Sequence, residues 1–189
     1  MKNKLIIFDC FGVIFDEIAP VFFRRHFGSD IGSRLKEKYF GPADLGTITR
    51  DELFTLMAKE LNMDKQAILD EWETLIKLRE DMPPTIKALK EKYDIALLSN
   101  APDGFVQRLM KEYSLENLFD KMFISSDLKM AKPDPEIYKL CVCAFNKEYD
   151  EIYMIDDNIK NLEVLPDLGI KGVLFTSIEN MLKDLGETL

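Results

Sequence analysis

Histidine, cysteine and long apolar runs are all scarce in this sequence of 189 residues. His26 is the single histidine, which argues against a Ser–His triad and against a histidine-based zinc site. The three cysteines form no zinc-binding pattern, and their odd number favours a reducing compartment. No apolar segment is long enough to span a membrane, and the apolar run at the N-terminus is too short for a signal peptide. We therefore expect a soluble, cytoplasmic protein that does not contact membranes.

Positive charge is also in deficit, because 25 Lys and Arg residues face 34 Asp and Glu residues, for a net charge of −9. Without a long basic run, binding of nucleic acid through phosphate contacts is disfavoured. An acidic protein that binds an anion must concentrate positive potential locally, through a metal ion, a lysine or the N-termini of helices. Apolar residues make up 47% of the chain, and its length fits one domain with a modest insertion. The sequence carries no signal for an oligomeric state.

Five short apolar runs each end abruptly in polar residues, and a helix-like stretch follows each of them. Such an alternation predicts βα units that build a buried parallel sheet. The runs are Leu5–Phe8, Ile95–Leu98, Met122–Ile124, Ile152–Ile155 and Gly172–Phe175. Because a buried parallel sheet needs helices on both faces, the predicted fold class is α/β, a three-layer Rossmann-like parallel sheet.

The segment 17–83 breaks this rhythm and has the pattern of helices throughout. The predicted helices are Val21–Phe27, Ser33–Phe40, Arg50–Leu61 and Lys65–Arg79. Thr49 and Glu52 form a capping box at the start of the third helix, and Pro83 and Pro84 are expected to end the segment. The expected organisation is an α/β core of residues 1–16 and 84–189 with a helical cap, residues 17–83, inserted after the first strand. An insertion at this place is well positioned to roof a site at the carboxyl end of that strand.

Polar side chains follow three of the predicted strands directly. They are Asp9, then Ser99 and Asn100, then Asp156 and Asp157. Ligands of open α/β sheets bind beyond the carboxyl ends of the strands, so we expect these residues to lie together, and Lys132 could reach them from its loop. Clustered carboxylates repel each other unless a cation lies among them, and all-oxygen ligation suits Mg²⁺. The cluster therefore predicts a Mg²⁺ site in which a free aspartate oxygen could act as a nucleophile.

Four segments resemble the motifs of the haloacid dehalogenase-like hydrolase superfamily, in the right order and spacing. They are Asp9–Asp16, Leu98–Asn100, Lys132–Pro135 and Asp156–Asn158. The helical segment 17–83 resembles the small cap that this superfamily inserts after its first motif. The phrase Leu45–Thr49 is similar to caps of small sugar-phosphate phosphatases. The resemblance implies a hydrolase with an aspartate nucleophile, best read as a Mg²⁺-dependent phosphatase of a small phosphorylated metabolite.

The resemblance also implies which residues bind the metal. Asp9 would be both the nucleophile and a metal ligand, and Phe11 would contribute its backbone carbonyl to Mg²⁺. Asp157 would be the inner ligand, and Asp156 would act directly or through a water molecule.

Other matching residues would bind the substrate. Ser99 and Lys132 would hold the phosphoryl group, and Lys132 would offset the charge on Asp9 as part of the catalytic machinery. Asn100 and the backbone N–H groups after it could hold the remaining anionic oxygens.

Phe11 departs from the pattern of the family. Phosphatases of this family usually carry an aspartate there, which protonates the leaving group and then activates water. Phenylalanine cannot transfer a proton, and general acid–base catalysis typically contributes ~10²–10⁴-fold. An aromatic residue here also resembles the 2-haloacid dehalogenase branch, whose leaving halide needs no proton and no metal. The adjacent carboxylates of Asp156 and Asp157 favour the Mg²⁺ site and phosphate-ester chemistry.

Two alternatives therefore remain beside the phosphatase. One is a 2-haloacid dehalogenase, and the other is a phosphometabolite-binding or interaction domain that has lost turnover. His26 is expected to be structural. Solvated positions are expected for Arg24, Arg25 and Arg34, although any one of them could contact a substrate anion.

Overall fold

A computed structural model describes residues 3–188, without the side chains of residues 29–33. Its central feature is a five-stranded parallel sheet. Its strands are β1 (Lys4–Phe8), β2 (Asp94–Ser99), β3 (Lys121–Ile124), β4 (Glu151–Asp156) and β5 (Lys171–Leu174). They lie in the order β3-β2-β1-β4-β5, so β1 is central, between β2 and β4. Each predicted strand is present, with bounds that differ by one residue at most at either end.

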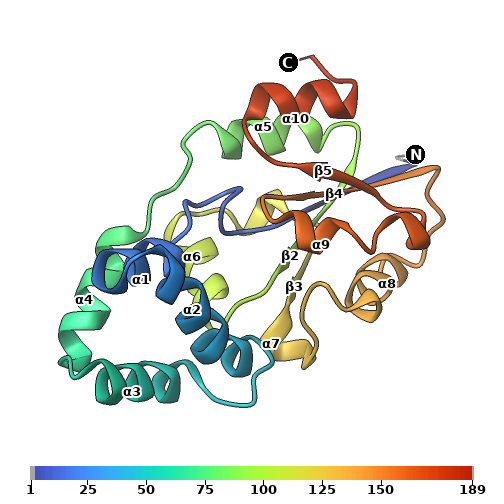
Figure 1. Cartoon of the computed structure of the whole chain (residues 1–189). Coiled ribbons are helices and arrows are strands. Elements are labelled where there is room, and N and C mark those ends of the chain that lie inside the picture. The colour runs from blue at the N-terminus through green and yellow to red at the C-terminus, as the bar shows by residue number, and fades with distance from the viewer. Residues whose placement is uncertain (1–2, 189) are drawn as a thin grey trace.

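Helices cover both faces of the sheet (Figure 1). On one face, α5 (Met82–Leu89), α6 (Phe105–Glu112) and α10 (Ile178–Leu185) pack against alternate strand residues such as Ile6 and Phe8. On the other, α8 (Pro135–Cys143) and α9 (Ile159–Leu162) pack against Leu5 and Ile7. Since β1 is buried on both sides, its continuous apolar run is what a central parallel strand requires. The three-layer α/β prediction is confirmed.

The helical insertion consists of four helices, α1 (Ala19–Phe27), α2 (Ser29–Asp44), α3 (Arg50–Leu61) and α4 (Lys65–Leu75). The passages that lead into and out of it run side by side. Asp16 N donates to Lys77 O at 2.9 Å, and Arg79 N donates to Ile14 O at 2.9 Å. Trp72 lies at the centre of the apolar core of the insertion, with its ring packed against Phe22, Phe40 and Phe54.

Two details of the helical segment differ from expectation. Pro83 and Pro84 do not end it; they lie in the first turn of α5, where proline costs nothing because the first N–H groups of a helix have no partner inside the helix. The fourth helix ends at Leu75, not at residue 79, because residues 77–79 instead pair with residues 14–16, the passage that leads into the insertion.

The remaining elements are short: 3-10 helices η1 (Glu116–Leu118) and η2 (Pro166–Leu168), and a single turn, α7 (Ser125–Leu128). Among the described residues, no helix combines the length and apolar character needed to cross a membrane.

Candidate active site

Three carboxylates meet at the carboxyl end of the central strands. Asp9 directly follows β1, Asp156 is the last residue of the neighbouring β4, and Asp157 comes next. Each of the three offers an oxygen that lies within 4.8 Å of the others. The parallel pairing of β1 with β4 explains this proximity, because it brings the two strand ends to the same edge of the sheet.

Lys132 lies inside this cluster. Its Nζ is 2.9 Å from Asp9 Oδ2 and donates to Asp156 Oδ2 at 2.6 Å, and its side chain is buried. Burial lowers the pKa of this lysine, but the charges of Asp9 and Asp156 outweigh burial, so the net shift is upward and Lys132 stays charged. The backbone of Lys132 is held by Asn100, whose Oδ1 accepts from Lys132 N at 2.8 Å and whose Nδ2 donates to Lys132 O at 2.9 Å.

Asp156 is fully buried and well supplied with donors. In addition to Lys132, it accepts from Asn158 N at 2.9 Å and from Asn161 Nδ2 at 3.0 Å to each of its oxygens. Sequence reasoning missed Asn161. The one feature of the sequence that could have indicated it is its position one turn after Asn158, the cap residue of α9. These contacts fix the carboxylate of Asp156 and leave it as the anchor of Lys132.

Asp9 and Asp157 are less well compensated. Burial raises the pKa of Asp9, against the opposing effect of Lys132. Burial, together with the nearby charges of Glu17 and Asp156, raises the pKa of Asp157 to about 6. Gly12 makes room for Asp157: it has φ +83°, and a Cβ placed there would lie 2.1 Å from Asp157 Oδ2. Only glycine therefore fits at this position, on both conformational and steric grounds.

The donor set fits a divalent cation. Lys132 pairs with two of the three carboxylates, Asp9 and Asp156, which leaves an excess of negative charge in a mostly buried cluster. Mg²⁺ binds oxygen at about 2.1 Å with octahedral geometry, so opposite ligands lie about 4.2 Å apart. The oxygens of the cluster all lie within 4.8 Å of one another, which is close to that value. The residues present could thus hold Mg²⁺ through Asp9 and Asp157, with Asp156 beside them.

Ser99 and Phe11 are placed differently from this cluster. Ser99 ends β2 and is buried, and its hydroxyl has no hydrogen-bond partner in the described part of the chain, but the residue does not line the cavity. Phe11 is among the cavity residues, and its ring stacks on that of Phe105, with ring centroids 5.5 Å apart. The phosphate contact of Ser99 and the metal contact of the Phe11 carbonyl stay predictions.

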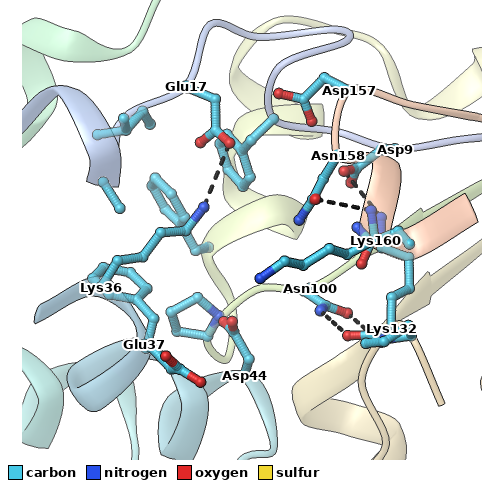
Figure 2. Close-up of a pocket in the computed structure, with 18 of the residues that line it drawn as sticks. Asp9, Glu17, Lys36, Glu37, Asp44, Asn100, Lys132, Asp157, Asn158 and Lys160 are labelled. Carbon is cyan, nitrogen blue, oxygen red and sulfur yellow. Dashed lines mark hydrogen bonds and ion pairs between the residues drawn. The ribbon is translucent and has the colours of Figure 1, made fainter. Parts of the chain in front are cut away.

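A cavity of about 350 Å³ opens above the carboxylates, between the sheet edge and the helical insertion (Figure 2). Asp9, Asn100, Lys132 and Asp157 lie on the side of the α/β core. The insertion and the passage leading into it contribute Glu17, Lys36, Phe40, Asp44 and Trp72. Glu17 and Lys36 form an ion pair of 3.4 Å within this wall. None of Arg24, Arg25 and Arg34 is among the cavity residues in the described structure, and all three are exposed.

Asp44, the last residue of α2, is a further cavity residue that sequence reasoning missed. Its Oδ1 is buried and has no hydrogen-bond partner among the residues that the structure describes. Burial raises its pKa to about 7, although Lys36 and Lys132 oppose the shift. Nothing in the local pattern distinguishes Asp44 from an ordinary surface aspartate, because its burial arises only where the insertion meets the core.

His26 has a structural place, as expected. It lies away from the cavity, contacts the ring of Phe22 and shares a hydrogen bond of 2.8 Å with Glu71 of α4.

The comparisons with known proteins point to hydrolases with this fold. The chain is 29% identical to D-ribitol-5-phosphate phosphatase of Bacteroides thetaiotaomicron over 188 residues, covering 89% of each chain. It is 25% identical to a phosphorylated carbohydrates phosphatase of Thermotoga maritima over 187 residues, covering 90% of this chain and 83% of the relative. A solved HAD family enzyme from Bacteroides thetaiotaomicron, a magnesium complex, has a TM-score of 0.79 and 24% identity, covering 98% of this chain and 99% of the other.

Two further matches are partial. The chain is 28% identical to (S)-2-haloacid dehalogenase 4A of Burkholderia cepacia over 136 residues, covering 69% of this chain and 58% of the relative. It is 24% identical to drimenol cyclase drtB of Aspergillus calidoustus over 165 residues, 82% of this chain, but spans only 31% of that protein. The family model described as haloacid dehalogenase-like hydrolase matches residues 3–169. Because this match covers most of its length, the chain belongs to the haloacid dehalogenase-like hydrolases.

Proposed function

We propose that this protein is a Mg²⁺-dependent phosphatase of a small phosphorylated metabolite, with Asp9 as its nucleophile. The observation that carries the proposal is the cluster of Asp9, Asp156 and Asp157 at the floor of a cavity, with the buried amine of Lys132 paired to the first two. Such a cluster can gather a cation and a phosphate group, which the acidic chain could not otherwise attract.

The residues of the cluster have separate tasks in this reaction. Bound Mg²⁺ would supply positive charge that stabilises the phosphoryl oxygens as their charge develops. Asp9 lies at the strand end facing the cavity, where its carboxylate can form a bond to phosphorus. Lys132 offsets the charge on Asp9 and can donate to a phosphoryl oxygen, while Asp156 and Asn100 keep this lysine in place.

The size of the cavity favours a compact substrate. Its volume of about 350 Å³ lies near the lower end of ligand pockets, which typically hold about 300–1,000 Å³. Two relatives are named for activity on phosphorylated carbohydrates and on D-ribitol 5-phosphate. We therefore favour a phosphorylated sugar or polyol. A cytoplasmic location accords with Cys10, Cys141 and Cys143, none of which forms a disulfide in the described structure.

Dehalogenation of a 2-haloacid is the second candidate, and Phe11 is the residue that favours it. Phe11 is an aromatic residue among those that line the cavity, and one relative is a 2-haloacid dehalogenase. The excess negative charge of the carboxylate cluster argues for the cation-dependent phosphatase, because a dehalogenase without metal would leave this charge uncompensated. Halide release from a 2-haloacid in the presence of EDTA would favour the second candidate.

The test of the proposed function is phosphate release from 4-nitrophenyl phosphate, measured with Mg²⁺ and with EDTA. We expect Mg²⁺-dependent activity that Asp9→Asn abolishes, since an amide cannot act as the nucleophile. Asp16→Asn is the matched control, because Asp16 is partly exposed and pairs with Arg79 outside the cavity. Activity that survives Asp9→Asn, or that EDTA leaves unchanged, would contradict the proposal.

A further inference from the structure

A phosphatase with Phe11 in place of the usual acid lacks a proton donor at that position, and Asp44 is the cavity residue that can supply one. Figure 2 shows Asp44 on α2, across the cavity from Asp9 and Asp157. In phosphoryl transfer the attacking and leaving oxygens lie roughly in line. A leaving group bound over Asp9 therefore points away from the sheet edge and toward the insertion, which is the side on which Asp44 lies.

The other titratable groups of this cavity are less suitable. Glu17 is paired with Lys36, and Lys132 is engaged by Asp9 and Asp156. Asp157 belongs to the carboxylate cluster that we assign to the metal. Glu37 and Lys160 are exposed, so water competes for their protons. Asp44, by contrast, has a buried carboxyl oxygen with no partner in the described residues, so it is free to form a hydrogen bond to a substrate.

We propose that Asp44 is the general acid and then the general base of the reaction, in the role that Phe11 cannot fill. This inference rests on the proposed phosphatase function. It assigns to the helical insertion a residue that touches the reacting atoms, in addition to the task of enclosing the substrate.

The electrostatic surroundings of Asp44 suit both halves of this role. Burial raises its pKa to about 7, the charge of Glu17 acts in the same direction, and Lys36 and Lys132 lower the pKa. Near neutral pH the acid and its carboxylate are then both populated. A general acid–base group works best when its pKa lies near the working pH.

The protons and bonds balance over two steps. In the first, an oxygen of Asp9 bonds to phosphorus, the bond from phosphorus to the leaving oxygen breaks, and the proton of Asp44 moves to that oxygen. The product leaves as a neutral alcohol. In the second, Asp44 removes a proton from a water molecule whose oxygen bonds to phosphorus, and the bond from phosphorus to Asp9 breaks. Phosphate leaves, and Asp44 is protonated again.

The test compares two kinds of substrate in Asp44→Asn. 4-Nitrophenyl phosphate releases a stable anion that needs no proton, whereas alkyl phosphates such as glycerol and pentitol phosphates release an alkoxide that does. We expect kcat/KM, which reports on the first step, to fall ~10²-fold or more for alkyl phosphates and far less for the aryl phosphate. With the aryl phosphate, a burst of nitrophenol should precede slow turnover, because the second step has lost its base.

Matched variants separate this role from a structural one. Asp70→Asn removes a charge from an exposed position of α4 and should leave kcat/KM unchanged for both kinds of substrate. Asp44→Glu, which keeps a proton donor, should retain part of the activity on alkyl phosphates. If Asp44→Asn does not fold, Asp44→Glu takes its place as the variant that tests the role of Asp44. Phe11→Asp introduced into Asp44→Asn should restore activity on alkyl phosphates, since it returns an acid to the usual position.

The possible failures are distinguishable. If the natural protein hydrolyses neither kind of substrate, the proposed function itself fails. If it hydrolyses the aryl phosphate but no alkyl phosphate of the panel, or if Asp44→Asn lowers kcat/KM equally for both kinds, the phosphatase stands and the role of Asp44 is overturned.

Discussion

Lys132 and Asp44 show how burial acts on two residues of the same cavity with opposite results. Lys132 is buried against Asp9 and Asp156, and these two charges keep it protonated. Asp44 is buried without a partner for its Oδ1, so burial instead favours its neutral form. The difference lies in pairing, because a buried charge is tolerated only where an opposite charge or a hydrogen bond compensates for it.

The raised pKa of Asp44 predicts a pH-dependent contribution to stability. The pKa is about 7 in the folded state, above the ordinary value of about 4 in the unfolded chain. The neutral carboxyl therefore stabilises the fold fully below about pH 4, and this contribution is lost as the pH rises through 7. Asp44→Asn, which stays neutral, should gain stability relative to the natural protein over this range, by up to ~1.4 kcal/mol per pH unit.

Urea unfolding of both proteins between pH 4 and 8, in EDTA, measures this difference. The other titrating carboxylates are common to both proteins and cancel in the comparison. A difference in unfolding free energy that stays constant with pH would show that Asp44 is already ionised in the folded state.

At the scale of elements, the start of α3 links the insertion to the core. Thr49 accepts from Glu52 N at 3.2 Å, and Glu52 Oε2 accepts from Thr49 N at 2.7 Å, which is the predicted capping box. Arg50 N donates to Asp103 Oδ1 at 2.5 Å, from the loop before α6. The guanidinium of Arg50 lies 5.0 Å from the ring centroid of Phe105. The first N–H groups of α3 thus obtain partners from both parts of the molecule.

Removal of the capping hydroxyl should destabilise the protein. We expect Thr49→Ala to lower the free energy of unfolding by ~1 kcal/mol, because Glu52 N loses its partner. Lys59→Ala is the control, because Lys59 is exposed on the same helix and its side chain has no partner in the described part of the chain, and it should stay within ~0.5 kcal/mol of the natural protein. Equal effects of the two substitutions in urea unfolding would mean that the capping box contributes nothing.

At the scale of the whole molecule, a chain with net charge −9 gathers three carboxylates at one edge of its sheet, and among the described residues Lys132 is the lysine that pairs with them directly, through Asp9 and Asp156. Folding therefore brings carboxylates that repel each other together at this edge, and a bound cation would reduce the repulsion. The helical insertion closes the cavity over the same edge, so the charge excess lies where the proposed substrate phosphate would bind (Figure 2).

Mg²⁺ should accordingly stabilise the folded protein. A ligand that binds only the folded state adds ~2.7 kcal/mol at a concentration 100 times its Kd, so the Tm should rise with Mg²⁺ and fall back with EDTA. Asp157→Asn should remove most of this response, because it removes one of the proposed ligands. Asp167→Asn, at an exposed position of η2, should keep it. A Tm that Mg²⁺ leaves unchanged in the natural protein would contradict the metal site.

Features that depend on local pattern could be predicted from the sequence. The five strands follow from short apolar runs, and α3 begins at Arg50 as its capping box indicates. Asp9, Asp156 and Asp157 could be assigned to one edge because parallel strands bring their carboxyl ends together, whatever the details of packing. For Lys132, the sequence indicates only a loop before a helix that could reach this edge, and its role follows from the family resemblance.

Features that depend on tertiary packing could not be predicted. Three examples are the burial of Asp44, the ion pair of Glu17 with Lys36, and the contact of Asn161 with Asp156. The residues next to them in the sequence do not indicate any of these features. The proline pair Pro83 and Pro84 is ambiguous in the sequence, since such a pair ends one helix or begins the next with the same local pattern. Periodicity and capping decided the elements and the carboxylate edge; only side-chain packing in three dimensions decided which charges are paired and which are left to meet a ligand.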